Sequence, residues 1–204
     1  MSRKSQPRHP ARTAYSVHRF PGAGKREAPP SREVVGSKAF GLMAMSRHGL
    51  PVPPGFVLGT ELCRAFMKHG PAALEGLEAV LAPELEHLGA ATGRRFGDGK
   101  RPLLVSVRSG AAVSMPGMME TVLNLGLSEP AVAGLIRSTG NPRLAHDCRR
   151  RLIQQFAEVV HGVPPGIFEA IVAERVKTDG LAGPQELDSE ALSDLSRASL
   201  EQYE

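Results

Sequence analysis

Two short strand-like segments, separated by a loop of small residues, constrain the fold of this chain most. Leu103–Val107 is a compact run of β-prone residues, and residues 121–125 alternate Thr, Leu and Leu with Val and Asn. Both patterns are typical of strands, and the first favours a buried strand. Pro116-Gly117 predicts a turn between them. The pair therefore predicts two strands of one sheet joined by a long loop.

Shorter patterns predict the elements before these strands. A strand is expected over residues 15–20, a helix over 37–48, a rigid extended segment over 51–55 and a second strand over 56–58. Thr60 is expected to cap a further helix that runs to about His69. Leucines then recur at helical spacing from Leu74 to Leu88, and Pro83 is expected to kink or split that helix.

The character of the chain changes after residue 128. Three helical faces follow, over residues 144–160, 168–176 and 187–198, and Asp188 is expected to cap the last. No comparable strand pattern occurs there. The sequence predicts an α+β protein with a flexible basic tail over 1–13, an α/β part with a small mixed sheet over 14–128, and an all-helical subdomain over 129–204.

The positive charge of the chain is concentrated at its start. The formal net charge is +4, but residues 1–32 carry +7 and the remaining residues carry −3. Aromatic residues make up only 4%, too few for a platform on which bases stack. We therefore expect no nucleic-acid partner. No apolar run is long enough to span a membrane and no secretory signal is evident, so we expect a cytoplasmic protein without a membrane partner.

Arg108 is the first candidate binding residue, because it ends the predicted buried strand. A guanidinium in that position requires a partner, and phosphate or carboxylate suits its geometry. The small residues that follow, Ser109 to Ala112, allow backbone N–H groups to approach an anion closely. The alternative from the residues alone is an internal pair between Arg108 and a carboxylate, beside an ordinary loop.

Lys38 is the second candidate, because it lies among small residues at the predicted start of a helix. Its ammonium group and the first N–H groups of the helix together favour a phosphate. The surrounding residues do not match the P-loop pattern, and a solvated lysine is the alternative. The cysteines and histidines lack the spacing of metal ligands, so no metal-binding residue is assigned.

Longer motifs connect these two segments. Residues 106–120 read SVRSGAAVSMPGMME and are followed by TVLNLGL. Residues 49–63 read GLPVPPGFVLGTELC, and RFGD and TGNPR occur at 95–98 and 139–143. In this order, and over roughly residues 15–200, the chain resembles the N-terminal, ATP-handling part of pyruvate phosphate dikinase.

That resemblance implies a partial ATP-grasp-type nucleotide-binding domain with a helical subdomain. In the family, a phosphoryl group passes from ATP to a histidine on another domain and then to pyruvate. By resemblance, Lys38 and Arg108 hold phosphates of ATP, and Gly117 and Met119 lie near the γ-phosphate. Mg²⁺ is the implied metal cofactor, with its carboxylate ligands outside these residues. No catalytic residue is assigned.

The chain also departs from the family pattern. The lysine segment of the family usually reads Gly-Gly-Lys-Gly, whereas this chain has Gly36-Ser37-Lys38-Ala39 followed by Phe40. The added Cβ atoms are expected to restrict the approach of the backbone to phosphate. The Gly-Gly-x-Thr-Ser-His-type motif of the phosphorylated histidine does not occur in these residues, nor does the barrel that binds pyruvate.

The sequence leaves two interpretations open. In the first, the chain is an incomplete enzyme part that works with a second chain and is inactive alone. In the second, it is a degenerate, non-catalytic module for nucleotide binding, regulation or interaction. A nucleic-acid binder is a distant third interpretation. We expect the chain by itself to form no phosphoenolpyruvate from ATP, phosphate and pyruvate.

Overall fold

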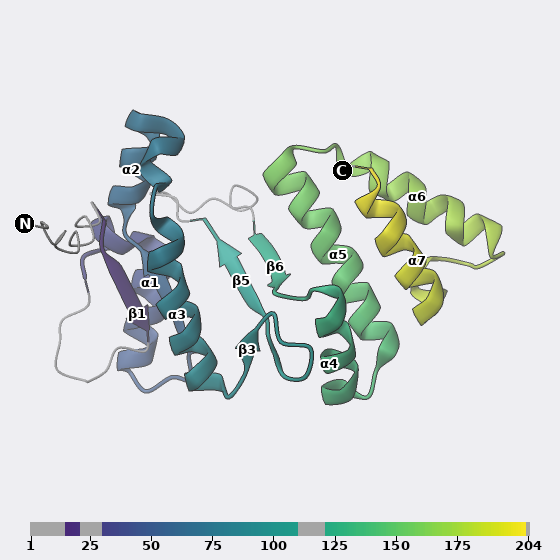
Figure 1. The fold of residues 1–204 in the computed structure, drawn as a ribbon, viewed down its shortest axis with the longest axis horizontal. Helices are drawn as coiled ribbons and strands as arrows, with labels where there is room; N and C mark the ends of the chain where they lie inside the picture. Colours follow the sequence, from purple (N-terminus) through teal and green to yellow (C-terminus); the bar gives the residue numbers. More distant parts are fainter. Residues whose placement is uncertain (1–14, 21–29, 110–120, 203–204) are drawn as a thin grey trace, which may run out of the picture. The chain divides into compact units, whose positions relative to one another are not determined.

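The computed structural model describes residues 15–20, 30–109 and 121–202, and the chain divides into two compact units (Figure 1). The first unit covers residues 1–78 and the second covers residues 79–204. The predicted tail over residues 1–13 lies outside the described residues.

The first unit joins a two-stranded sheet to two helices. Its elements are β1 Val17–Phe20, α1 Arg32–Arg47, β2 Gly55–Leu58, α2 Thr60–His69 and the short 3₁₀ helix η1 Gly70–Leu74. β1 and β2 are antiparallel, with Val17 opposite Leu58. The core of the unit lies on one side of α1, where Val35, Ala39 and Met43 are buried. The predicted strands and helices of this region are therefore confirmed, with boundaries shifted by a few residues.

The described residues of the second unit include four short strands in two pairs. Its first elements are α3 Leu77–Thr92, β3 Arg95–Phe96, β4 Pro102–Leu103, β5 Val105–Arg108 and β6 Thr121–Leu125. α3 begins just before the division between the units. β3 and β4 are parallel, whereas β5 and β6 are antiparallel with a register shift between Val105 and Val107.

Four further helices follow among the described residues: α4 Glu129–Thr139, α5 Pro142–His161, α6 Pro165–Thr178 and α7 Ser189–Leu200, with the 3₁₀ helix η2 Pro184–Glu186 before α7. One buried cluster joins Leu127 to Ala131, Leu135 and Ala145. A second surrounds Leu187 and Leu192 and receives apolar side chains from α6. The described residues after 128 include no strand, as the sequence predicts.

Several local predictions are wrong for identifiable reasons. The strand expected over 103–107 is interrupted: Leu103 is buried in β4, whereas β5 is half-buried at Val105 and exposed after it. A strand in a two-stranded sheet has few neighbours that can bury its side chains. β-prone residues in such a strand therefore indicate that they suit a pleated surface, and they do not indicate that they are buried. Thr60 is the first helical residue and Gly59 is the N-cap, because the Thr60 hydroxyl donates to the carbonyl of Glu33, 2.6 Å away.

α3 is not split, because it continues through Pro83 as one helix, and a kink at Pro83 stays a prediction. A proline removes a single backbone hydrogen bond, and the remaining turns keep theirs. The helix α4 was not predicted from the sequence. In contrast, Asp188 caps α7 as expected, because its Oδ1 accepts a hydrogen bond from the N–H of Ala191 at 2.8 Å.

The described part of the chain is an α+β protein with small sheets, as expected. The assignment of an ATP-grasp-type domain stays a prediction, and so does its boundary at residue 128. Among the described helices, none combines the length and the apolar character that crossing a membrane requires.

Candidate functional site

The first candidate segment is a helix start inside α1. Gly36 has φ 78° and ψ 161°, which breaks α1 into a short first turn and a longer helix that begins at Ser37. A positive φ of this size is readily adopted only by glycine. The first N–H groups of a helix have no acceptor within the helix. Lys38, which is half-buried, therefore lies at a helix N-terminus, as the sequence predicts.

The two residues after Lys38 contribute to packing. Ala39 is only 8% exposed and belongs to the core cluster with Val35 and Met43, so its methyl group is inside the unit. The guanidinium of Arg32 lies 5.4 Å from the centre of the Phe40 ring. The side chains of Ala39 and Phe40, which distinguish this segment from Gly-Gly-Lys-Gly, thus pack within the first unit.

The second candidate segment is the end of β5. Arg108 is exposed and lies opposite Thr121 of β6. Among the described residues, its side chain has no hydrogen-bond or ion-pair partner. The alternative of an internal Arg–carboxylate pair therefore finds no support in this part of the chain. The guanidinium is available to an anion from outside.

The other two predicted site residues, Gly117 and Met119, lie outside the described residues. Lys38 belongs to the first unit and Arg108 to the second. The structure therefore describes two separate cationic positions, each on its own unit. Among the described residues, no group of three His, Cys, Asp or Glu is able to hold a metal ion.

The TGNPR motif at residues 139–143 has a structural role between α4 and α5. Gly140 ends α4 in the left-handed conformation, and its N–H donates to the carbonyl of Ile136 at 2.7 Å. The Asn141 side chain then caps α5 by accepting the N–H of Leu144 at 2.9 Å. Pro142 follows at the first helical position, where a missing N–H costs nothing.

Arg143 completes the motif by binding backbone carbonyls. Its Nε donates to the carbonyl of Leu187 at 2.8 Å, and its Nη2 donates to that of Gln185 at 2.7 Å. These bonds join the start of α5 to the segment that precedes α7. The geometry therefore explains this motif by packing rather than by ligand binding.

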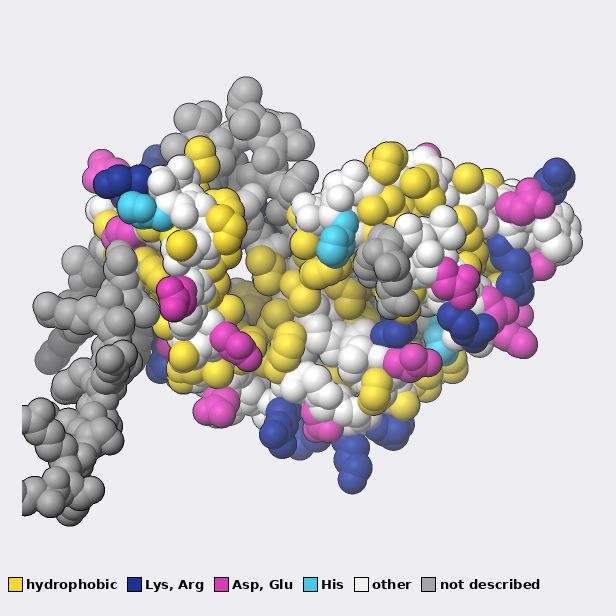
Figure 2. Space-filling model, turned by 45° about the horizontal axis from the view of Figure 1, so that its top comes forward, with side chains coloured by type: hydrophobic (Ala, Val, Ile, Leu, Met, Phe, Trp, Pro, Cys, Tyr) yellow, Lys and Arg dark blue, Asp and Glu magenta, His cyan; other side chains and the backbone are white. Residues whose placement is uncertain are grey.

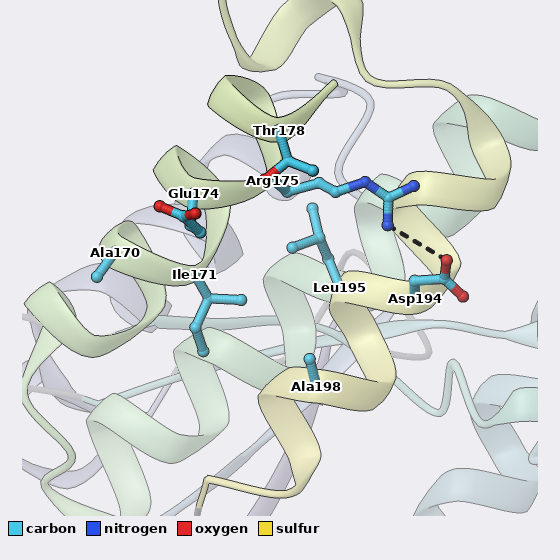
Figure 3. Close-up of a pocket in the computed structure, with 8 residues that line it drawn as sticks. All are labelled: Ala170, Ile171, Glu174, Arg175, Thr178, Asp194, Leu195 and Ala198. Carbon is cyan, nitrogen blue, oxygen red and sulfur yellow. Dashed lines mark hydrogen bonds and ion pairs between the residues drawn. The ribbon is translucent and has the colours of Figure 1, made fainter. Parts of the chain in front are cut away.

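A shallow groove between α6 and α7 has a volume of about 480 Å³ (Figure 3). Ile171 and Leu195 form its apolar floor, and Arg175 pairs with Asp194 at 3.3 Å. The hydrogen bonds that Arg175 donates to Asp179 and Asp194 raise the pKa of Arg175, so this side chain keeps its charge. Neither Lys38 nor Arg108, the two predicted site residues that the structure describes, lines the groove.

Comparison with known proteins finds several dikinases that are similar to this chain. No family model matches the chain. Pyruvate, phosphate dikinase of Clostridium symbiosum is 40% identical over 165 residues, which are 81% of this chain and 19% of that protein. Pyruvate, phosphate dikinase 2 of Zea mays is 42% identical over 185 residues, 90% of this chain and 21% of that protein. This chain is a relative of the pyruvate, phosphate dikinases.

The similarity extends across distant dikinases but covers a small part of each. The enzyme of Rhizobium meliloti is 44% identical over 154 residues, which are 75% of this chain and 17% of that protein. The chain thus spans about one fifth of the length of the dikinases that it matches.

Sequence reasoning missed one residue of the candidate site. Gly36 was recognised only as part of the lysine segment, yet its positive φ creates the helix start that carries Lys38. A glycine within an otherwise helical pattern is a recognisable signal for such a break. Here the sequence predicted no helical turn before Gly36, so this glycine did not stand inside a predicted helix.

Proposed function

We propose that this chain is the ATP-binding portion of a cytoplasmic phosphotransferase of the pyruvate phosphate dikinase type. The complete reaction converts ATP, phosphate and pyruvate into AMP, diphosphate and phosphoenolpyruvate through a phosphohistidine. In this proposal, residues 14–128 form the α/β part of an ATP-grasp-type domain and residues 129–204 form its helical subdomain. A second chain, or residues beyond these, supplies the histidine and the pyruvate site.

The exposed guanidinium of Arg108 is the observation that carries this proposal. It ends β5 immediately before the loop of small residues, and no described side chain neutralises it. An arginine fork binds two phosphate oxygens at once, and glycine and alanine leave room for backbone N–H groups to approach. The residues Gly117 and Met119 of this loop are proposed to lie near the γ-phosphate.

Lys38, in the first unit, is likewise proposed to hold a phosphate of ATP. Its position at a helix start adds the N-terminal N–H groups to the charge of the ammonium. These residues contribute positioning and electrostatic stabilisation, which dominate phosphoryl transfer. Mg²⁺, when bound, neutralises part of the phosphate charge. Since the described residues provide no cluster of metal ligands, we assign none of the ligands to them.

Calorimetric titration of the 204-residue chain with Mg·ATP tests this proposal. We expect Arg108→Ala to weaken binding about tenfold, because a charge-assisted hydrogen bond is lost at an exposed site. Lys38→Ala is expected to weaken it by a smaller factor, since the helix N–H groups remain. The matched controls are Arg151→Ala and Lys68→Ala, which remove exposed cations elsewhere and are expected to leave binding unchanged.

Two outcomes of the titration would contradict the proposed site. If wild type binds no ATP, the chain is not an ATP-binding portion by itself, and either an incomplete enzyme part or a degenerate module is favoured. If Arg108→Ala binds as tightly as wild type, Arg108 does not hold the phosphates.

A measurement of turnover distinguishes an incomplete part of an enzyme from a complete enzyme. We expect the purified chain to form no phosphoenolpyruvate from ATP, phosphate and pyruvate, because no residue is assigned the phosphocarrier role. A coupled assay for phosphoenolpyruvate measures this directly. Sustained product formation by the chain alone would show that the missing chemistry is present in it.

A further inference from the structure

Five exposed cationic side chains gather around the loop between β3 and β4. They are Arg94, Arg95, Lys100, Arg101 and Arg137. The N–H of Arg95 donates to the carbonyl of Arg101 across the loop, and Arg137 at the end of α4 donates to the carbonyl of Gly99. All belong to the second unit. Lys and Arg side chains gather at the bottom of the view in Figure 2.

Asp98, a single carboxylate, lies close enough to interact with the charges of Arg95 and Lys100, so it compensates the five cations only in part. Among the described residues, none of the five forms an ion pair with Asp or Glu within 4.0 Å. Asp98 is the acidic residue within the loop, and its two oxygens accept the N–H groups of Lys100 and Arg101 at 3.0 and 3.4 Å. These backbone hydrogen bonds, led by that of Lys100, lower the pKa of Asp98, so it stays ionised while it shapes the loop.

An apolar groove of about 440 Å³ lies beside these cations, between α3 and β3. Leu85 and Ala90 of α3 and Phe96 of β3 line it, and Arg94 and Arg95 stand at its border. Phe96 is 39% exposed. Its ring packs on Gly126, where a Cβ would lie only 2.9 Å from Phe96 Cε2. The groove therefore presents a fixed aromatic surface next to several guanidinium groups.

We propose that this surface, formed by the groove and the five cations, binds an acidic protein segment that carries one apolar side chain. Carboxylates of the segment pair with Arg95, Lys100 and Arg101, and the apolar side chain fills the groove against Phe96. Arginine and aromatic residues at a fixed surface are the residue types that contribute most to binding at protein interfaces. The proposal is independent of ATP and goes beyond the proposed function.

A protein segment fits this surface better than a phosphate-rich ligand does. Phosphate or a nucleic-acid backbone offers no apolar group for Leu85, Ala90 and Phe96. Glu86 also lines the groove, and its exposed carboxylate accepts hydrogen bonds from backbone N–H groups, which a peptide offers and a phosphate does not. Charge complementarity favours an acidic partner, and the apolar groove favours a peptide among such partners.

Fluorescence anisotropy with the full 204-residue chain tests this docking surface. The probe is a dye-labelled peptide of Asp and Glu with one central Phe. We expect saturable binding that weakens about tenfold when the central Phe is replaced by Ser, because the groove is then unfilled. Arg95→Glu combined with Lys100→Glu is expected to weaken binding at least about tenfold, since like charges then face each other.

The control variant makes the same charge change elsewhere. Lys68→Glu combined with Lys177→Glu replaces two exposed lysines on α2 and α6, and it is expected to bind nearly as wild type does. Circular dichroism and the unfolding transition show that each variant remains folded. Phe96→Ala, which keeps every charge, is expected to abolish the preference for Phe over Ser in the peptide.

Each other result would overturn the proposal. Absence of binding, or equal binding of the Phe and Ser peptides, would show that no apolar docking occurs. Equal weakening by both charge-reversal variants would indicate unspecific electrostatic attraction. Displacement of the peptide by inorganic phosphate or diphosphate, at matched ionic strength, would show that the surface is a phosphate site.

Discussion

Replacing Gly126 with Ala is expected to reduce the free energy of unfolding of the second unit by about 4 kcal/mol, through backbone strain and overpacking together. Gly126 has φ 98°, which side chains with a Cβ rarely adopt. A Cβ built at this position would lie 2.6 Å from the carbonyl oxygen of Leu103 and 2.9 Å from the Phe96 ring. The oxygen belongs to the backbone of β4, so it has little freedom to move away.

Two other glycines separate the causes of this effect. Gly140 has φ 66° but no atom within 4 Å of the position that a Cβ would occupy, so Gly140→Ala is expected to cost about 1 kcal/mol from strain alone. Gly166 has neither a positive φ nor a close neighbour, and Gly166→Ala in α6 is expected to be neutral or slightly stabilising. Urea unfolding followed by circular dichroism measures all three. If Gly126→Ala costs no more than Gly140→Ala, the close contact with Leu103 is not important.

The helical half of the fold was predictable from the sequence because its signals are local. The faces of α5, α6 and α7 repeat at helical spacing, and the cap at Asp188 depends on residues three positions apart. Residues 121–125 likewise form the strand β6, as their alternating pattern predicts. Such features depend on little beyond the neighbouring residues.

The features that sequence reasoning missed depend on distant contacts. The exposure of residues 105–107 depends on the sheet that they join, which has only two strands among the described residues. A local sequence pattern does not indicate how many strands a sheet has. The N-cap at Gly59 results from the bond between Thr60 and Glu33, which are 27 positions apart. α4 is the exception, because Pro130 in its first turn and Gly140 after its end are local signals that sequence reasoning overlooked.

The candidate site was predictable in its chemistry but not in its geometry. The sequence placed Lys38 at a helix start, and the break at Gly36 provides one. It also placed Arg108 at the end of a strand, which the structure confirms. That strand was expected to be buried, and this prediction is wrong, because Ser106, Val107 and Arg108 are exposed. Local residue types indicate which groups suit a phosphate, whereas their exposure depends on the packing of the whole unit.

Arg143→Ala is expected to reduce the free energy of unfolding of the second unit by about 2 kcal/mol, because hydrogen bonds from a charged donor are lost. The carbonyl of Leu187 is one of its acceptors, and Leu187 itself is 1% exposed in the core beneath α7. Without the guanidinium, the carbonyls of Leu187 and Gln185 lose their partner, and the start of α7 loses its attachment to α5.

A nearby arginine on the same helix provides the comparison for Arg143. Arg151 has a side chain that is 64% exposed, and its only described ion pair is with Asp147 at 2.8 Å. Arg151→Ala is expected to change the free energy of unfolding by no more than about 0.5 kcal/mol, as surface ion pairs usually do. Hydrogen exchange of the amides in α7 gives the sharper measurement, because Arg143→Ala should accelerate exchange there and Arg151→Ala should not. Equal exchange in the two variants would mean that the core around Leu187 holds α7 without Arg143, and the TGNPR motif would then need another explanation.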